Sequence, residues 1–529
     1  IYNSNFPTDW FDPEWMFGVT DGFDIVIGNP PYVSTKGVSE KDKKVLQQQF
    51  GFADDLYNHF YFKGIQLLKE KGILAYISSK TFWTIQTKKN LRELILKNKL
   101  LQLVDTANPF ESAMVDTCIT IVQKENASDY DIKFIDLRNG WDNKKEYSVK
   151  DSVYKNVVNN VFFEPNEINM KIYEKIAKKL NPLIKNWWSL ISTSKNIEKY
   201  KTELENYRQS LKPGDITLLG LITEGGQGLA TANNGKYIGV LEGTKWADKV
   251  RQDRVQKLWE FIQNQKPKEL IHLKSKTDVQ LYLNQLSEKE IRNLFDDLKE
   301  NYGRDIFGQG SLYRIVNANE IADVEKLTQD EKLNGISGTK TFVPYDKGDK
   351  DGNRWWAPTP YYIDWSRENV KFLKENSGKK GEGMPVVRNP QFYFREGFCW
   401  SDIHTKFIKC RIKESGIHDV KSMSLFSLNV SNFPDFYFVT ILNSTFISEY
   451  VEAFIKNTQT FQINDARQLP IIIPTQEQLK EFEAIFDRAM AIQKQKFLGT
   501  ISENKAQALL DEIQRELDEK VMELYGVKE

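Results

Sequence analysis

Residues 29–32 have the sequence Asn-Pro-Pro-Tyr, and these residue types suit one kind of chemistry. The side-chain oxygen of Asn29 and the backbone carbonyl of Pro30 are two acceptors that can share one amino group. An amine attached to an aromatic ring is a poor nucleophile, because its lone pair is delocalised into the ring. Two acceptors would hold such an amine nearer to tetrahedral geometry and stabilise the positive charge that develops during attack. Pro30 and Pro31 would fix the backbone, and Tyr32 would offer a flat face for stacking.

The segment before this loop predicts the element that positions it. Residues 23–27 are mostly apolar and β-favouring, and the run ends at Gly28 before the two prolines. This pattern predicts a buried parallel strand that ends in a tight loop. Loops at the carboxyl ends of such strands are where α/β sheets bind ligands. We therefore expect the loop of Asn29 to be a ligand site at the edge of a sheet.

The strand and loop together resemble the catalytic motif of the gamma class of N6-adenine DNA methyltransferases, which use S-adenosylmethionine. More closely, the chain resembles type IIG restriction-modification enzymes and their stand-alone methyltransferase relatives. The resemblance implies that Asn29, Pro30, Pro31 and Tyr32 are catalytic and that the target adenine is flipped out of the duplex. Two alternatives stay open here: a chance turn in an unrelated protein, and methylation of protein glutamine, whose carboxamide NH2 fits the same two acceptors.

The chain continues with alternating helices and strands. Asp54 and Asp55 predict the start of a helix that runs to about residue 70. Further patterns predict a strand at 73–78, a helix at 87–97, and strands at 101–106 and 117–122. The resemblance implies that Asp55 and Leu56 help to bind the cofactor and that Phe110 stacks on the flipped adenine opposite Tyr32. The last two strands resemble the antiparallel pair that closes the methyltransferase sheet, so we expect this domain to be residues 1–125.

Composition indicates a folded protein of several domains. The chain has 529 residues, of which 40% are hydrophobic and 12% aromatic. Lys plus Arg and Asp plus Glu balance at 73 each, so a DNA-binding surface must come from charge placed on one face. The three cysteines have no CxxC spacing, which argues against a disulfide framework or structural zinc and favours a reducing cytoplasm. No apolar run approaches a membrane span, and the four scattered histidines predict no metal site.

The cofactor site is only partly accounted for. In the resembled family a glycine-rich turn precedes the catalytic motif, and residues 1–22 contain no such turn. We therefore expect an N-terminal segment or a second subunit to complete the methyltransferase domain and to carry any nuclease, which would leave this chain alone inactive. A rival hypothesis makes Gly226-Gln227-Gly228 the cofactor loop of a permuted enzyme. It is disfavoured because a Rossmann-type loop should open a helix.

The rest of the chain favours DNA over a protein substrate. Residues 126–182 predict a connector, and residues 183–475 resemble the specificity domains of restriction-modification enzymes, with a charged helical insert at about 245–335. A glutamine methyltransferase has no need of such a region. Arg, Asn and Gln read the edges of guanine and adenine in the major groove. The candidate DNA-binding residues, found in two aromatic-rich stretches, are Arg354, Trp355, Arg388, Asn389, Gln391 and Arg395.

Residues 476–529 show helical spacing of apolar residues and predict a C-terminal helical hairpin. The expected architecture is an α/β Rossmann-like methyltransferase domain, represented by the C-terminal half of its sheet, then an α+β target-recognition domain and this hairpin. The resemblance implies a site-specific adenine N6-methyltransferase that acts on double-stranded DNA in a restriction-modification or related phage-defence system. The alternative from another class is a non-catalytic DNA-binding specificity module that lacks its cofactor half.

Overall fold

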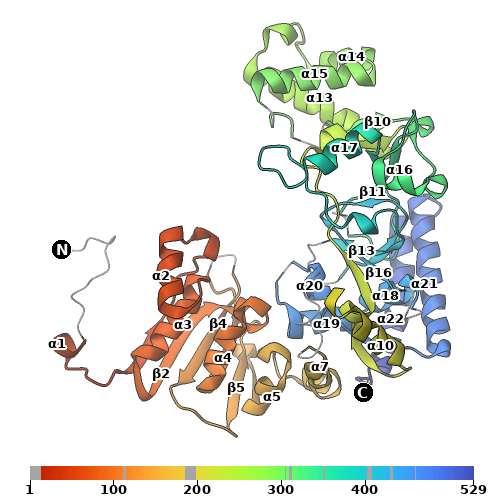
Figure 1. Cartoon of the computed structure of the whole chain (residues 1–529). Helices are drawn as coiled ribbons and strands as arrows, with labels where there is room; N and C mark the ends of the chain where they lie inside the picture. Colours follow the sequence, from red (N-terminus) through yellow and green to blue (C-terminus); the bar gives the residue numbers. More distant parts are fainter. Residues whose placement is uncertain are drawn as a thin grey trace.

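The structure is a computed structural model that describes residues 13–110, 115–184, 198–303, 305–308, 312–348, 352–401, 408–428, 433–458 and 460–528. Figure 1 shows a sheet covered by helices near the N-terminus and a larger second region that ends in two long helices. One hydrophobic core runs through both, from Tyr57 in a helix of the first region to Tyr525 near the C-terminus. None of the helices that the structure describes is long and apolar enough to cross a membrane.

The first sheet has six strands in the order β1-β2-β4-β3-β5-β6. The strands are β1 (Phe23–Gly28), β2 (Leu68–Ser79), β3 (Lys99–Ala107), β4 (Thr117–Gln123), β5 (Asp131–Asp136) and β6 (Lys145–Lys150). β1 is parallel to β2 and β3 to β5, whereas β4 is antiparallel to both of its neighbours, as predicted for the closing pair. The sheet therefore extends past residue 125, where the sequence predicted its end, because β5 and β6 lie in the predicted connector.

β1 corrects one prediction. It is parallel, as expected, but it lies at the edge of the sheet and pairs only with β2. Its two faces differ: Val26 packs against the main core, whereas Ile25 is 62% exposed and Ile27 is 80% exposed. The prediction that this strand is buried is thus wrong for the residues that the structure describes. Its apolar residues are present, but Ile25 and Ile27 remain exposed.

The helices of this region are α1 (Pro13–Phe17), α2 (Glu40–Phe50), α3 (Leu56–Leu67), α4 (Lys89–Lys97) and α5 (Asp151–Asn156). α3 and α4 cover the sheet with amphipathic faces, whereas Trp15 of α1 is 80% exposed and α2 has no buried residue. Tyr61 and Ile65 of α3 and Leu91 and Ile95 of α4 are one turn apart and buried, so each helix presents one apolar stripe to the core. The connector then forms α6 (Glu167–Ile172), a π-helical turn (Tyr173–Ala177) and α7 (Lys178–Leu183).

The second region contains three small sheets, ordered β10-β9-β12-β11-β15, β14-β13-β16-β8 and β17-β7. Their strands are β7 (Ile216–Leu218), β8 (Thr223–Gly226), β9 (Ile238–Leu241), β10 (Arg314–Val316), β11 (Phe342–Asp346), β12 (Tyr361–Asp364), β13 (Gly397–Ser401), β14 (Arg411–Lys413), β15 (Ile417–His418), β16 (Ser422–Ser427) and β17 (Pro470–Ile472). Short helices lie among them: α10 (Lys201–Ser210), α11 (Leu219–Ile222), α12 (Asn234–Tyr237) and α17 (Arg367–Glu375).

The predicted helical insert lies between β9 and β11. It consists of α13 (Lys245–Gln265), α14 (Lys276–Gln285), α15 (Glu288–Tyr302) and α16 (Gln329–Asn334), with β10 between the last two helices. Leu258, Val279 and Phe295 belong to a hydrophobic cluster separate from the main core. In Figure 1 helices α13 to α15 project from the sheets as a unit.

The C-terminal part is largely helical, and the helices after residue 476 were expected. It comprises α18 (Asp435–Leu442), α19 (Thr445–Tyr450), a π-helical turn (Val451–Ile455), α20 (Ile463–Ala466), α21 (Gln476–Phe497) and α22 (Glu503–Leu524). α21 and α22 run side by side and pack on the second region through Phe482, Ile485 and Leu517. The predicted helical hairpin is therefore present.

Candidate functional site

The Asn-Pro-Pro-Tyr loop lies at the edge of the first sheet where three strands end together. β1 and β2 run in the same direction, and β3 shares it because β4 is antiparallel to both β2 and β3. The loop of Asn29 follows β1, and the loop that contains Phe110 runs from β3 toward β4. The topology therefore brings the two loops to one edge, which is where α/β sheets bind ligands.

Within the motif loop, polar groups face outward and apolar groups face inward. Asn29 is exposed, and its carboxamide makes no hydrogen bond with any residue that the structure describes. Pro30 is buried, so its backbone is fixed by packing as well as by its ring. Tyr32 is half-buried with its hydroxyl turned inward, and burial raises the pKa of this hydroxyl. The free Asn29 amide is the group best placed to meet a ligand.

The downstream end of the loop is tied to the start of α3. Asp55 Oδ1 accepts hydrogen bonds from Thr35 N at 2.8 Å and from Thr35 Oγ1 at 2.9 Å. The backbone N–H of Leu56 donates to the carbonyl of Val33 at 3.0 Å. Asp55 is the N-cap residue of α3, but its side chain makes no capping bond within the helix. Its carboxylate instead holds the loop that follows Tyr32.

Lys88 completes this network. Its Nζ donates to Asp55 Oδ2 at 2.8 Å and also contacts Asp54 Oδ1, and Lys88 is only 4% exposed. Burial alone would raise the pKa of Asp55, but the hydrogen bonds from Lys88 and Thr35 hold it below its usual value. Asp54 further accepts from Asn58 Nδ2 at 2.8 Å. Sequence reasoning missed Lys88, because nothing in the run before α4 links it to carboxylates 33 and 34 positions earlier.

The candidate DNA-binding residues fall into two groups. Trp355 is 1% exposed, and the half-buried Arg354 donates from Nη1 to Gln514 Oε1 of α22 at 2.7 Å. These two residues join the C-terminal hairpin to the second region, and the burial of Trp355 contradicts the prediction that it faces DNA. Aromatic residues between polar ones are typical of both a binding surface and a core, which is why the sequence misled here.

The other four candidates lie together. Arg395 Nη1 pairs with Glu224 Oε1 at 2.7 Å and lies over the rings of Phe392 and Phe426, so its charge is already matched. Arg388, Asn389 and Gln391 line one cleft together with α10, the end of β8 and α20. The structure thus brings three of the six candidates to one polar cleft.

Gly226 and Gln227 of the rival cofactor loop Gly226-Gln227-Gly228 line the same cleft. β8 ends at Gly226, and the next helix, α12, begins only at Asn234, whereas a Rossmann-type loop should open a helix directly. Gly228 approaches the backbone so closely that an added Cβ would lie 1.8 Å from the carbonyl oxygen of His418. Both observations argue against the permuted cofactor hypothesis.

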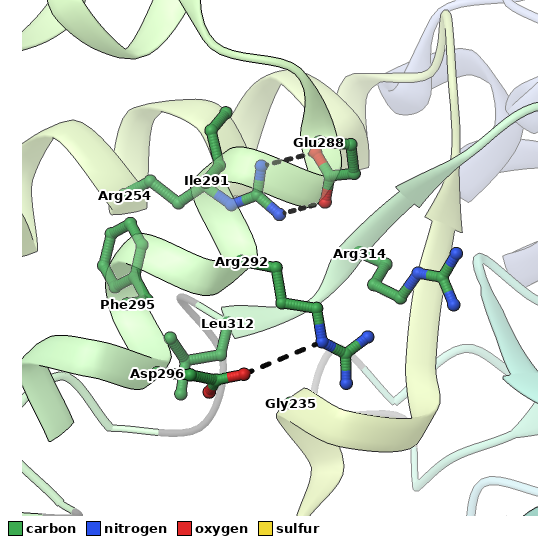
Figure 2. A pocket seen from close by; sticks show the side chains of 9 residues that line it. All are labelled: Gly235, Arg254, Glu288, Ile291, Arg292, Phe295, Asp296, Leu312 and Arg314. Atoms are coloured by element: carbon green, nitrogen blue, oxygen red, sulfur yellow. Dashed lines mark hydrogen bonds and ion pairs between the residues drawn. The ribbon is translucent and has the colours of Figure 1, made fainter. Parts of the chain in front are cut away.

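Figure 2 shows a further pocket, where the helical insert meets the sheet. Three arginines line it, but each has a carboxylate partner. Arg254 forms a two-point pair with Glu288 at 2.8 and 2.5 Å. Arg292 Nε lies 3.9 Å from Asp296, and Arg314 lies 3.4 and 3.5 Å from two further carboxylates. Since these charges are matched, the pocket fastens the insert rather than offering a binding site.

Comparison with known proteins points to one family for the N-terminal segment. Residues 3–111 match the family model described as Eco57I restriction-modification methylase. A stretch of 141 residues is 27% identical to the type II restriction enzyme and methyltransferase RM.Eco57I of Escherichia coli, covering 25% of this chain and 14% of that protein. Another of 132 residues is 33% identical to a putative type II restriction enzyme and methyltransferase of Methanocaldococcus jannaschii, covering 24% of this chain and 11% of that protein.

A solved structure of the type IIL restriction-modification enzyme MmeI in complex with DNA aligns with 96% of this chain and 55% of its own, at 10% identity and a TM-score of 0.48. The matched segments are thus a small part of the curated relatives. Residues 3–111 include the whole Asn-Pro-Pro-Tyr loop and the carboxylates that hold it. Over this segment, the predicted resemblance to restriction-modification methyltransferases is confirmed.

Proposed function

We propose that the chain is part of a site-specific DNA methyltransferase that transfers a methyl group to N6 of a flipped adenine, as in type IIG-like restriction-modification systems. The observation that carries the proposal is the exposed, unbonded carboxamide of Asn29 beside buried Pro30, at the carboxyl end of β1. This segment lies within the match to restriction-modification methylases.

The chain's own residues account for the activation of the amine. Asn29 Oδ1 and the carbonyl of Pro30 each accept one hydrogen bond from the adenine NH2 and draw its nitrogen toward tetrahedral geometry. As positive charge grows on that nitrogen, both bonds strengthen, which lowers the barrier. The proton is lost after the transfer, so no base is needed before it. Tyr32 and Phe110 provide the aromatic faces between which a flipped base stacks.

S-adenosylmethionine supplies the methyl group when it is bound. The described residues account for only part of a site for this cofactor. A glycine-rich turn is missing, because no loop after β1, β2 or β3 has paired glycines in the part that the structure describes. Asp55 and Leu56 flank the motif loop and would contact it there. We assign the remaining contacts to an additional segment or subunit that pairs with the free edge of β1, where Ile25 and Ile27 are exposed.

The test is mass-spectrometric detection of N6-methyladenine in unmethylated plasmid DNA. The 529-residue chain is incubated with S-adenosylmethionine, alone and joined to the polypeptide encoded immediately upstream. We expect N6-methyladenine with the joined form and none with the chain alone. Absence of the mark with both forms would contradict the proposed reaction. Its appearance with the chain alone would keep the reaction and overturn the need for a completing segment.

A further inference from the structure

The cleft that holds Arg388 has the properties of a base-reading site. It is bounded by α10, the end of β8, residues 388–392 and α20. We infer that this cleft reads purine edges in the major groove of duplex DNA, with the Arg388 guanidinium bound to a guanine. The inference rests on the proposed function, since it takes DNA as the substrate.

Arg388 is a charge of the cleft that has no partner among the residues that the structure describes. Its guanidinium has no ion pair or hydrogen bond with any residue of the described ranges, and its Nη1 is buried. A charged donor that is buried and unbonded destabilises the unbound protein. Arg395, seven residues on, pairs with Glu224, and the three arginines of Figure 2 all have carboxylates. A ligand that supplies acceptors to Arg388 would remove this destabilisation.

Two carboxamides beside Arg388 are also available. The side chains of Gln227 and Gln391 line the cleft and make no hydrogen bond within the part of the chain that the structure describes. Gln pairs in two-point fashion with adenine N6 and N7, and Arg with guanine O6 and N7. One free guanidinium and two free carboxamides therefore form a set of donors suited to adjacent purines.

The backbone around these donors is held firmly. Asn389 Nδ2 donates to the carbonyl of Gln227 at 2.8 Å, and Asn389 has a left-handed φ of 47°. Arg467 Nη2 of the segment after α20 donates to the carbonyl of Gly225 at 2.8 Å. Asn389 and Arg467 thus position the loops that present Arg388 and Gln227. A pre-ordered site loses little entropy when it binds its ligand.

Charge favours base edges over the phosphate backbone. Lys201, Arg208 and Arg467 line the cleft beside Arg388, but Glu198 and Glu205 lie among them. Arg208 Nε donates to the carbonyl of Leu221 at 2.6 Å, so part of its guanidinium is already committed. A phosphate would be repelled by the two glutamates, whereas the neutral acceptors of a guanine would not. The mixed charge therefore points to base readout, which specifies sequence.

The experiment selects DNA sequences from a pool of random duplexes, using the full chain, and compares wild type with Arg388→Lys and Arg388→Ala. Arg488→Lys and Arg488→Ala are matched controls, because Arg488 is an exposed arginine of α21 paired with Glu516. Arg388→Lys keeps the charge and loses the two-point fork. We expect it to lower discrimination for guanine at one position about tenfold, with other positions unchanged. Thermal unfolding confirms that each variant is folded.

Three results would overturn the inference: full sequence preference in Arg388→Ala, a uniform loss of affinity for all sequences in Arg388→Lys, or a wild-type chain that binds duplexes without preference. Methyl transfer by the joined form is measured on the same DNA. Methylation without an effect of Arg388 on preference refutes the cleft alone. Sequence-specific binding that depends on Arg388, with no methylation, supports the cleft and refutes the proposed reaction.

Discussion

Around the motif loop, charged side chains bind one another: Lys88 contacts Asp54 and Asp55, and Asp55 accepts two bonds from Thr35. In the cleft of the second region, Arg388 has no partner among the described residues. The first arrangement fixes a loop and leaves only Asn29 to meet a substrate. The second arrangement fixes the backbone of the cleft loops and leaves several side-chain hydrogen-bond donors free. A reaction at one atom requires a rigidly held loop, whereas reading a DNA sequence requires hydrogen-bond donors that the protein leaves free. The motif loop has the first property and the cleft of Arg388 has the second.

The largest expected effect concerns the reacting position itself. Replacing Asn29 with Ala removes one acceptor of the amine and should lower methyl transfer by at least about 100-fold. Because Asn29 lies far along the chain from the cleft residues, the sequence preference of DNA binding should stay unchanged. Initial rates with the joined form and the random-duplex selection measure the two quantities. A variant that methylates at the wild-type rate would refute the role of Asn29.

Removing the cation of the support network should be the next largest effect. Lys88→Met leaves Asp54 and Asp55 partly buried without their counter-charge, which should cost about 2–3 kcal/mol of local stability. Amide hydrogen exchange should accelerate at residues 33–36 and 54–58 and stay unchanged at residues 216–226. Lys89→Met, at the exposed neighbouring position, is the control. Equal protection in both variants would show that the network does not hold the loop.

Acid should destabilise both regions through buried histidines, because burial also lowers the pKa of His59 in α3, and the larger effect should fall in the second region. Burial, with Lys413 adding to it, lowers the pKa of His418 to about 3. An unfolded chain therefore binds a proton that the folded state excludes between pH 6.5 and 3, and stability falls by about 1.4 kcal/mol per pH unit as pH drops through this range. The pKa of Asp55 is instead lowered by bonds to its charged form. Its contribution is present above about pH 4 and is lost only as pH falls further.

Urea denaturation of wild type and His418→Gln at pH 7 and pH 4.5 checks this order. Wild type should lose more unfolding free energy than the variant when the pH is lowered from 7 to 4.5. Hydrogen exchange then shows whether residues 223–228 open before residues 33–36. The same pH dependence in both proteins would show that His418 does not set the acid response.

The smallest expected effect comes from removing one of the two hydrogen bonds that Thr35 donates to Asp55. Thr35→Val removes the hydroxyl donor at 2.9 Å and keeps the backbone donor at 2.8 Å. The loss should be about 1 kcal/mol, the usual worth of a single hydrogen bond. Thr35→Ser restores the hydroxyl and should behave as wild type. Local exchange rates at residues 33–36 measure the difference.

The sequence predicted those features that depend on local pattern. Apolar runs bounded by glycine and proline gave the strand and loop of residues 23–32, and helical spacing gave both C-terminal helices. The antiparallel pair β3 and β4 also followed from local signals and the resemblance. The sheet's continuation through β5 was missed, because residues 131–136 mix polar and aromatic residues in a way that is typical of loops as well as strands.

The remaining features depend on contacts between distant parts of the chain. Trp355 is buried where its ring meets Phe486 of α21, about 130 positions later, and the sequence around Trp355 contains no trace of this contact. Lys88 acquires its role only when the fold brings it to Asp54 and Asp55. Arg388 and Arg395 look alike in sequence, and only Glu224 distinguishes them. Tertiary partners, which a single sequence does not reveal, set the function of each of these residues.

The contacts of the C-terminal hairpin also bear on the order in which the protein matures during synthesis. All six strands of the first sheet that the structure describes have been synthesised once residue 150 has left the ribosome, so its share of the core can form early. The second region must wait: β7 pairs with β17 and Arg354 binds Gln514, so its core stays open until nearly the last residue is added. For most of translation, a folded methyltransferase-like sheet is therefore followed by an unfinished reading region. A truncated product would keep the first and lose the second.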